Sequence, residues 1–408
     1  MKLTQIDIKG FKSIDGQNGQ NIFLGNVTVL LGANGSGKSN LVAFFKMLNF
    51  LTTGALQNYV GKQGASQLLF YGPKVTESLS FVLHFSSDPL KVKGTYEVGL
   101  SYGLPDRLFI SSEKITLRRN EEAQPKVYLL ASGTAASGLS GLDHSFGHET
   151  GDVSPHRPEQ TGYARENVHV TTAGLSDDKE QTSEIDHFLR ADIRTYQFHD
   201  TSDTAKIKDR GYVDDAKYLR SDAGNLAPFL KMLKEHVDFK RSYERIIRRI
   251  QRVMPQFGDF SLETLPGNEK YVRLNWIDAK GGDYLFGPDQ ISDGSLRFMA
   301  LTTLLLQPPA LLPRFIVIDE PELGLHPSAI AELAGMVREV SNKVQVLVAT
   351  QSTRLVDEFA PDELVIVERD ETGRSSLFKK LDAEQLEEWL ERYCLSELWE
   401  KNVLGGQP

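Results

Sequence analysis

Hydrophobic and polar residues alternate along four stretches in the first third of the chain. A period of two is typical of strands that expose one face. It predicts antiparallel strands over residues 79–85, 93–103, 107–118 and 126–130. Residues 26–31 are a shorter, apolar run rich in β-forming residues. Residues 315–320 begin with an unbroken apolar run, which is typical of a strand buried on both faces of a parallel sheet.

Apolar residues at helical spacing mark five other stretches. Helices are predicted over residues 40–50, 223–234, 239–254, 295–306 and 327–341. Further strands are predicted over residues 344–350 and 363–368, with a short hairpin formed by 271–276 and 282–286. Because strands and helices alternate toward the end of the chain, the sequence predicts a largely parallel sheet there.

Residues 131–183 have a different character. Ser, Gly, Thr, His, Asp and Glu dominate this stretch, and the apolar periodicity is lost. We therefore expect an irregular insertion over 131–183, which separates an N-terminal region, residues 1–130, from the rest. A helical lobe over 184–260 and a C-terminal region over 261–408 follow.

Composition narrows the class of protein. The chain has 408 residues, of which 40% are hydrophobic and 25% charged, enough for two substantial lobes. It contains no apolar run of about 18 residues, so no membrane span is expected. The N-terminus lacks the apolar core of a signal peptide, and the single cysteine, Cys394, excludes internal disulfides. These features predict a cytoplasmic protein.

Residues 32–39 read Gly-Ala-Asn-Gly-Ser-Gly-Lys-Ser, the complete phosphate-binding loop between a predicted strand and a predicted helix. The glycines let the backbone wrap around phosphates, and the helix directs its positive dipole end at the same anion. Lys38 is expected to reach the β- and γ-phosphates of ATP, and Ser39 to bind Mg²⁺. The nucleotide-binding residues predicted here are Gly32, Asn34, Gly35, Ser36, Gly37, Lys38, Ser39 and Asn40.

Two carboxylates end the predicted strand 315–320. Asp319 is expected to hold Mg²⁺ opposite Ser39, and Glu320 to act as the general base toward an attacking water. An Asp-Glu pair at a strand end is by itself most often a solvated strand end. Together with the glycine loop, it instead predicts an ATPase.

Residues 291–296 read Ile-Ser-Asp-Gly-Ser-Leu and open a predicted helix shortly before the Asp-Glu strand. The stretch resembles the signature motif of ABC-type ATPases, usually Leu-Ser-Gly-Gly-Gln. Ser292 and Gly294 match that motif, whereas Asp293 and Ser295 depart from it. The resemblance implies that Ser292 and Gly294 bind the γ-phosphate held by a second subunit, so that ATP joins a homodimer.

Other residues resemble the RecF/SMC branch of these ATPases and the related OLD-like proteins. Residues 6–13 look like the first strand and turn of that branch, and residues 319–327 look like its Walker B and D-loop. Gln351 stands where the switch of the branch has histidine. Glutamine can hydrogen-bond the γ-phosphate or the water, but it cannot carry a positive charge. Residues 395–406 are also typical of bacterial ATPases of this branch, with no role assigned.

The resemblance implies an α/β fold of the ABC type of P-loop NTPase. It has a mixed central sheet, an antiparallel β layer and a helical insertion lobe. The Walker A loop lies in the N-terminal region, and the signature, Walker B and switch lie in the C-terminal region. Lys38, Glu320 and Gln351 are then the expected catalytic residues, and Ser39 and Asp319 the expected metal ligands.

Two functions remain open. The first is an ATP-dependent switch that dimerises on ATP and controls DNA or a partner effector, such as a nuclease, with anti-phage defence as one setting. The second is a RecF-like DNA-binding repair protein, for which the basic, amphipathic helix 239–254 would contact phosphates. The net charge of −9 requires such a local patch for any nucleic-acid contact. Too few residues follow 368 for an intrinsic Toprim nuclease domain.

Overall fold

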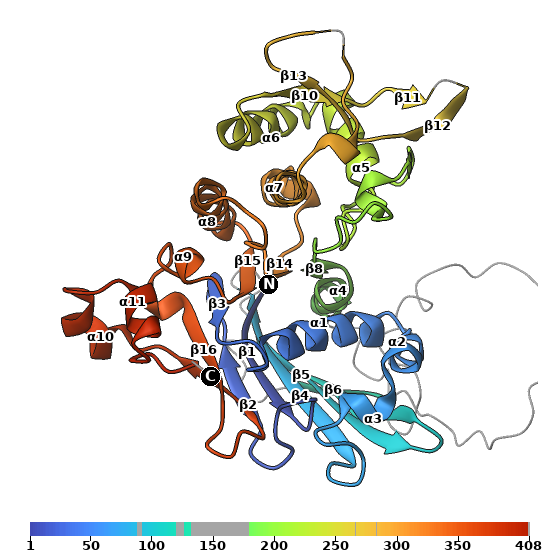
Figure 1. Ribbon diagram of the computed structural model, residues 1–408. Helices are drawn as coiled ribbons and strands as arrows, with labels where there is room; N and C mark the ends of the chain where they lie inside the picture. Colours follow the sequence, from blue (N-terminus) through green and yellow to red (C-terminus); the bar gives the residue numbers. More distant parts are fainter. Residues whose placement is uncertain (88–91, 120–125, 132–178, 266, 283, 407–408) are drawn as a thin grey trace, which may run out of the picture. The chain divides into compact units, whose positions relative to one another are not determined.

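The computed structural model describes residues 1–87, 92–119, 126–131, 179–265, 267–282 and 284–406 (Figure 1). The chain divides into two compact units. Unit 1 consists of Met1, Leu3–Asn21 and Met47–Arg190, and unit 2 of Lys2, Ile22–Lys46 and Ala191–Pro408. Helix α1, Lys38–Thr52, contributes to both units. Among the described residues, no helix combines the length and the apolarity that crossing a membrane requires.

Unit 1 is built on a six-stranded sheet in the order β2-β1-β4-β5-β6-β7. The strands are β1 Lys2–Lys9, β2 Gln20–Phe23, β4 Ser78–Ser87, β5 Val92–Gly103, β6 Arg107–Arg119 and β7 Lys126–Ala131. β4, β5, β6 and β7 pair antiparallel with one another in that order, as the alternating pattern predicted. The helices of this unit are α2 Leu56–Gln63, α3 Ala65–Leu68 and α4 Lys179–His187, which the π-helix Phe188–Asp192 follows. Most of the insertion expected over 131–183 lies outside the described residues.

Unit 2 contains the mixed sheet β17-β16-β3-β15-β14-β8. Its strands are β3 Val27–Leu31, β8 Ile193–Tyr196, β14 Phe315–Asp319, β15 Gln345–Thr350, β16 Leu364–Arg369 and β17 Ser376–Lys380. All neighbours pair in parallel except β16 and β17. Every residue of β3, β14 and β15 is buried, as expected for strands covered on both faces. This sheet and the antiparallel sheet of unit 1 confirm the predicted fold class.

Helices and small sheets complete unit 2. The helices are α5 Leu226–Glu235, α6 Lys240–Val253, α7 Asp293–Leu306, α8 Pro327–Ser341, α9 Thr353–Val356, α10 Ala383–Leu390 and α11 Leu395–Glu400. Short 3₁₀ turns lie at Lys206–Lys208, Pro288–Gln290, Pro309–Leu311 and Pro361–Glu363. The small strands are β9 Gly211–Tyr212, β10 Phe257–Ser261, β11 Thr264–Leu265, β12 Asn268–Val272 and β13 Asn275–Asp278. The stretch 184–260, predicted to be a helical lobe, therefore also contains short strands, namely β8, β9 and most of β10.

The hairpin predicted from residues 271–276 and 282–286 is wrong in its main partner. Strand β13 pairs antiparallel with the earlier strand β10, and only an isolated bridge joins Trp276 to Phe286. Trp276 is buried and its ring stacks on Phe286, so aromatic packing accounts for the bridge.

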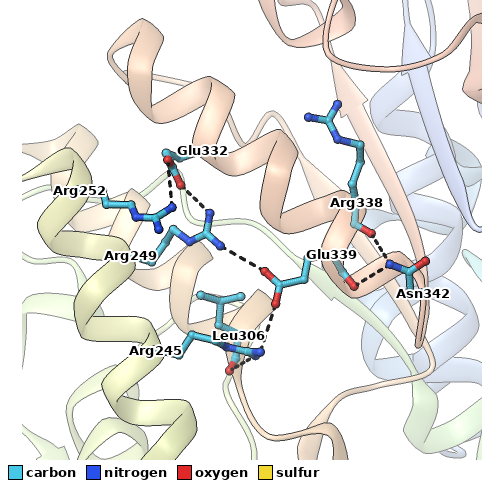
Figure 2. A network of polar contacts seen from close by, with 8 residues as sticks. All are labelled: Arg245, Arg249, Arg252, Leu306, Glu332, Arg338, Glu339 and Asn342. Carbon is cyan, nitrogen blue, oxygen red and sulfur yellow. Dashed lines mark hydrogen bonds and ion pairs between the residues drawn. The ribbon is translucent and has the colours of Figure 1, made fainter.

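The basic face of α6 has acidic partners within unit 2. Arg249 contacts two carboxylates of α8, with Nη1 at 2.6 Å from Glu332 and Nη2 at 3.2 Å from Glu339 (Figure 2). Arg245 also contacts Glu339, at 3.2 Å, and donates to the carbonyl of Leu306. Some of the positive charge that helix 239–254 shows in the sequence is therefore neutralised within the chain.

Replacing Arg249 should destabilise unit 2. Its side chain is 19% exposed, and removing it leaves Glu332 paired with Arg252 at 3.7 Å and Glu339 paired with Arg245 at 3.2 Å. We expect Arg249→Ala to lower the free energy of unfolding by about 1–2 kcal/mol. Arg248→Ala on the same helix is the control, since this arginine is exposed and its ion pair with Glu244 is long, at 3.9 Å. Urea unfolding of both variants measures the difference, and equal losses would contradict a packing role for Arg249.

Candidate functional site

The phosphate-loop motif forms a tight turn between β3 and α1. Gly35 and Gly37 have φ of +78° and +121°, which side chains rarely tolerate. A Cβ on Gly32 would lie 2.2 Å from the carbonyl oxygen of Val367, so the backbone of β16 requires glycine there. Lys38 Nζ donates to the carbonyls of Gly32 and Ala33, at 2.6 and 2.9 Å. The lysine therefore ends inside the curve of its own loop.

The two predicted carboxylates, Asp319 and Glu320, lie at the carboxyl end of strand β14. The phosphate loop follows β3 at the same end of the sheet. Asp319 is 5% exposed, and its Oδ1 atom has no hydrogen-bond partner among the described residues. Burial raises the pKa of Asp319 above its usual range, because water no longer solvates the charge. Glu320 follows at φ +43°, a strained value for a residue with a side chain. Burial lowers the pKa of Lys38. The negative charges of Glu320, Asp319 and Glu322 raise this pKa and so oppose the decrease.

A chain of polar groups that no sequence motif indicated supports Asp319. Gln197 lies just after β8, the parallel neighbour of β14, and its Nε2 donates to Asp319 Oδ2 at 3.2 Å. His199 Nε2 is 2.9 Å from the main-chain oxygen of Asp319. Since a carbonyl only accepts, this nitrogen is the donor, and the other ring nitrogen can accept from Gln197 at 3.2 Å. Lys46 donates to Gln197 Oε1 at 2.8 Å and completes the chain.

A third carboxylate, Glu322, fixes the switch that follows β15. Its Oε1 accepts a hydrogen bond of 2.6 Å from the Thr350 hydroxyl and one of 3.3 Å from the main-chain N–H of Gln351. Burial raises the pKa of Glu322, and these two bonds oppose that rise. Gln351 is half-buried, and its main chain is tied to the segment that carries Asp319 and Glu320.

The signature residues begin helix α7. Ser292 is its N-cap, and its hydroxyl oxygen accepts from the main-chain N–H of Ser295 at 3.3 Å. Asp293 is exposed in the first turn and does not cap the helix. A Cβ on Gly294 would lie 2.0 Å from the carbonyl oxygen of Gly324, so the packing of this chain alone requires glycine there. Within the described residues, no hydrogen bond joins Ser292 or Gly294 to loop 32–39.

Arg297, one turn into α7, connects the signature helix to both neighbouring segments. Its guanidinium donates to the carbonyls of Phe198 and His199 at 3.1 and 2.9 Å, and to that of Leu323 at 3.0 Å. One side chain therefore fixes the segment that carries His199 and the loop after the Walker B strand. Arg297 was not predictable from the sequence, since the three carbonyls come from distant segments.

The arrangement fits a nucleotide and a divalent cation. The free Oδ1 of Asp319 is a hard oxygen ligand that lacks a protein partner in the described residues, and Ser39 is an exposed hydroxyl at the N-terminal turn of α1. Groups of three or more His, Cys, Asp or Glu side chains placed to bind a metal are absent from the described residues. Asp319 and Ser39 therefore suit a cation that also binds phosphate oxygens, rather than one held by the protein alone.

Removing the charge of Asp319 should stabilise the protein without nucleotide or Mg²⁺. At pH 7 we expect Asp319→Asn to raise the free energy of unfolding by about 1 kcal/mol, because a buried neutral amide costs less than an unpaired carboxylate. A raised pKa in the folded state favours folding below the unfolded-state pKa, and this contribution is lost as pH rises through the folded-state pKa. The gain of the variant should therefore shrink in acid and grow toward neutral pH.

Urea unfolding at several pH values measures this difference. Glu371→Gln is the control, because Glu371 is exposed and its neutralisation should change stability by less than about 0.5 kcal/mol. If the Asp319→Asn variant is less stable than the native protein at pH 7, the buried charge of Asp319 does not destabilise the fold, and the prediction is wrong.

The chain is similar to known proteins in family and in fold. A family model described as "AAA domain, putative AbiEii toxin, Type IV TA system" matches residues 27–357. Comparison with curated proteins gives no match. Among solved structures, the SMC head bound to the C-winged helix domain of ScpA is 16% identical, with a TM-score of 0.53, and the match covers 95% of this chain and 100% of that one.

A second solved structure is the SMC head domain with an extended coiled coil, bound to the C-terminal domain of ScpA derived from Pyrococcus furiosus. It is 17% identical, with a TM-score of 0.53, and the match covers 95% of this chain and 98% of that one. Both likenesses concern the fold, which is that of the SMC head domains, as the resemblance to the RecF/SMC branch implied. The family model covers most of the chain, which therefore belongs to the family of AAA domains that this model describes.

Proposed function

We propose that this chain is an ATP-binding and ATP-hydrolysing switch that closes as a homodimer on ATP. The observation that carries the proposal is the buried Asp319 Oδ1, unpaired within the described residues, on the sheet whose strand β3 leads into the phosphate loop. Strands β3, β15 and β14 are parallel neighbours, so their carboxyl ends, followed by Gly32, Gln351 and Glu320, share one edge of the sheet.

Each polar group then has a role in hydrolysis. Lys38 moves from the carbonyls it contacts to the β- and γ-phosphates. Ser39 and Asp319 would hold Mg²⁺, which would neutralise charge on the phosphates. Glu320 accepts the proton of the attacking water, and Gln351 donates an amide hydrogen bond to the water or the γ-phosphate. Because Gln351 cannot become positively charged, we expect slow turnover in the absence of a partner.

The dimer follows from the signature at the start of α7. The Ser292 hydroxyl and the N-terminal turn of this 14-residue helix can bind the γ-phosphate held by a second copy of the chain. Asp293 stands exposed in that turn, and its charge opposes an anion. The contact across the dimer is therefore weaker than it would be with glycine at position 293. A weaker contact suits a clamp that opens after hydrolysis.

The readout of the switch is a partner effector. The two similar SMC heads were solved with ScpA domains, so this fold also serves as a docking platform in those proteins. The matched family model names a toxin–antitoxin context. We therefore propose that the chain controls a separately encoded effector, such as a nuclease, in bacterial defence. In this role it would act as a cytoplasmic ATPase.

The alternative function is a RecF-like DNA-binding repair protein. Its best support is helix α6, but Arg245, Arg249 and Arg252 of that helix contact Glu332 and Glu339 (Figure 2). Ion pairs within the chain compete with phosphate contacts for these three arginines. A smaller exposed set remains for a nucleic acid: Lys240, Arg241 and Arg248.

The variant Glu320→Gln should trap the ATP-bound dimer. Without the carboxylate, no group at position 320 accepts the proton of water, and we expect hydrolysis to fall at least about 100-fold. Light scattering coupled to size exclusion should then show a dimer in ATP and Mg²⁺ and a monomer without nucleotide. The control Lys38→Ala/Glu320→Gln should stay monomeric in ATP, because the phosphates lose their cation. A monomeric Glu320→Gln protein in saturating ATP would contradict the clamp.

The DNA alternative is tested by reversing the charges that α8 does not neutralise. If α6 contacts phosphates, the triple variant Lys240→Glu/Arg241→Glu/Arg248→Glu should bind DNA more weakly at low salt. The slope of log affinity against log salt should fall by about 3, roughly 0.9 for each lost contact.

A charge-matched variant separates a specific surface from net charge. It carries Lys62→Glu, Lys280→Glu and Lys343→Glu, three exposed lysines outside α6. Equal losses in the two triple variants would contradict a DNA surface on α6. No DNA binding by the native protein at low salt would exclude the alternative function.

A further inference from the structure

The C-terminal segment 395–406 reaches the phosphate loop directly. The carbonyl oxygen of Gly406 accepts a hydrogen bond of 3.0 Å from the main-chain N–H of Ala33, the second residue of the loop motif. In the other direction, Gly406 N–H donates to Glu368 Oε2 at 3.0 Å. Gly406 therefore lies between a carboxylate of β16 and the nucleotide loop, and holds both through its backbone.

The backbone at this point requires glycine. Gly405 and Gly406 have φ of +78° and +82°, a region that side chains disfavour. A Cβ on Gly406 would lie 2.7 Å from Ile366 Cγ2, and one on Gly405 would lie 2.7 Å from Glu368 Oε2. The pair of glycines is therefore explained by close approach to β16, immediately beside the loop.

Two further bonds hold the outer side of the same loop. The Ser376 hydroxyl donates to the carbonyl of Ser36 at 2.5 Å, and Arg369 Nε donates to the carbonyl of Gly35 at 2.9 Å. In a trans peptide the C=O and N–H groups point in opposite directions. Holding the Ser36 carbonyl outward therefore turns the N–H of Gly37 to the inner side, where phosphate binds.

The other end of the segment is attached near the switch. Ser396, in α11, donates to the carboxylate of Asp357 with its N–H at 2.8 Å and its hydroxyl at 2.6 Å. Asp357 is the C-cap of α9, the short helix that follows Gln351. Leu398 is fully buried and Leu404 is 8% exposed, so packing holds the stretch between the two attachments.

We propose that residues 395–406 form a clasp that keeps the phosphate loop in its nucleotide-binding shape, with Gly406 and Glu368 as positioning residues for ATP. The inference rests on the proposed function, since it concerns the affinity for that nucleotide. It assigns a role to a segment that, within the described residues, makes no hydrogen bond or ion pair with Asp319 or Glu320. An element bound at Asp357 and at Ala33 also connects the switch to the phosphate loop.

The test uses Glu368, whose two interactions can be removed separately. Glu368→Ala removes the acceptor for Gly406 N–H and also an ion pair with Lys379. Glu368→Gln keeps an acceptor oxygen and loses the ion pair. Lys379→Ala loses the ion pair and keeps the hydrogen bond, so it is the matched control.

We expect Glu368→Ala to weaken binding of Mg-ATP roughly tenfold, by calorimetry on the full chain. Glu368→Gln should recover most of the affinity, and Lys379→Ala should stay within about twofold of the native protein. A merely stabilising role predicts loss of affinity in proportion to loss of thermal stability in all three variants. Native affinity in Glu368→Ala, or an equal loss in Lys379→Ala, would overturn the clasp.

Hydrogen exchange without nucleotide separates this inference from the proposed function. The amide of Ala33 should exchange faster in Glu368→Ala than in the native protein, and at the native rate in Lys379→Ala. If the native protein fails to bind ATP, the proposed function is wrong, and the exchange rates alone decide whether the clasp exists. Unchanged exchange of Ala33 in Glu368→Ala would refute the clasp.

Discussion

The carboxylate of Asp319 is buried, and the candidate site in unit 2 depends on this constraint. Burial makes the charge costly, and one of its oxygens has no partner among the described residues. The other oxygen and the main chain are held by Gln197 and His199, so the unpaired oxygen keeps a fixed position. In the proposed function, a cation that binds together with the nucleotide would relieve this cost, and this relief would contribute to the affinity for the metal–nucleotide complex.

The backbone of Glu320 is also held in an unfavourable state, in this case a strained backbone conformation. A residue with a side chain rarely adopts φ near +43°, and the position persists because its N–H donates to the carbonyl of Ala349 at 2.8 Å. Glu322, two residues later, binds the strand end at Thr350. Backbone geometry and hydrogen bonds on both sides therefore hold the general-base candidate in place. Strain of this kind at a strand end is typical of a site kept ready for chemistry.

The sequence predicted what is local and missed what is distant. The phosphate loop and the Asp-Glu strand were predictable, because each motif contains its own chemistry and its flanking elements. Gln197 and His199 lie about 120 residues from Asp319, and no local pattern shows that β8 pairs with β14. The acidic partners of α6 also lie far away in the sequence, so its basic face resembled a free surface. The hairpin failed for another reason, because the alternating pattern does not say whether a strand pairs with the preceding or the following one, and β13 pairs with the earlier strand β10.

In the proposed dimer, Arg297 would give the two halves of each ATP site a short physical connection. Ser292, at the start of α7, would meet the phosphate of a second copy, whereas Arg297 on the same helix binds the carbonyl of His199. His199 in turn donates from Nε2 to the main-chain oxygen of Asp319, the predicted metal ligand of its own chain. Two consecutive hydrogen bonds, one to the main chain of His199 and one from its side chain, thus join helix α7 to the main-chain oxygen of Asp319. A rigid shift of α7 on dimer closure would therefore move a support of Asp319, and the two ATP sites would be coupled through the protein.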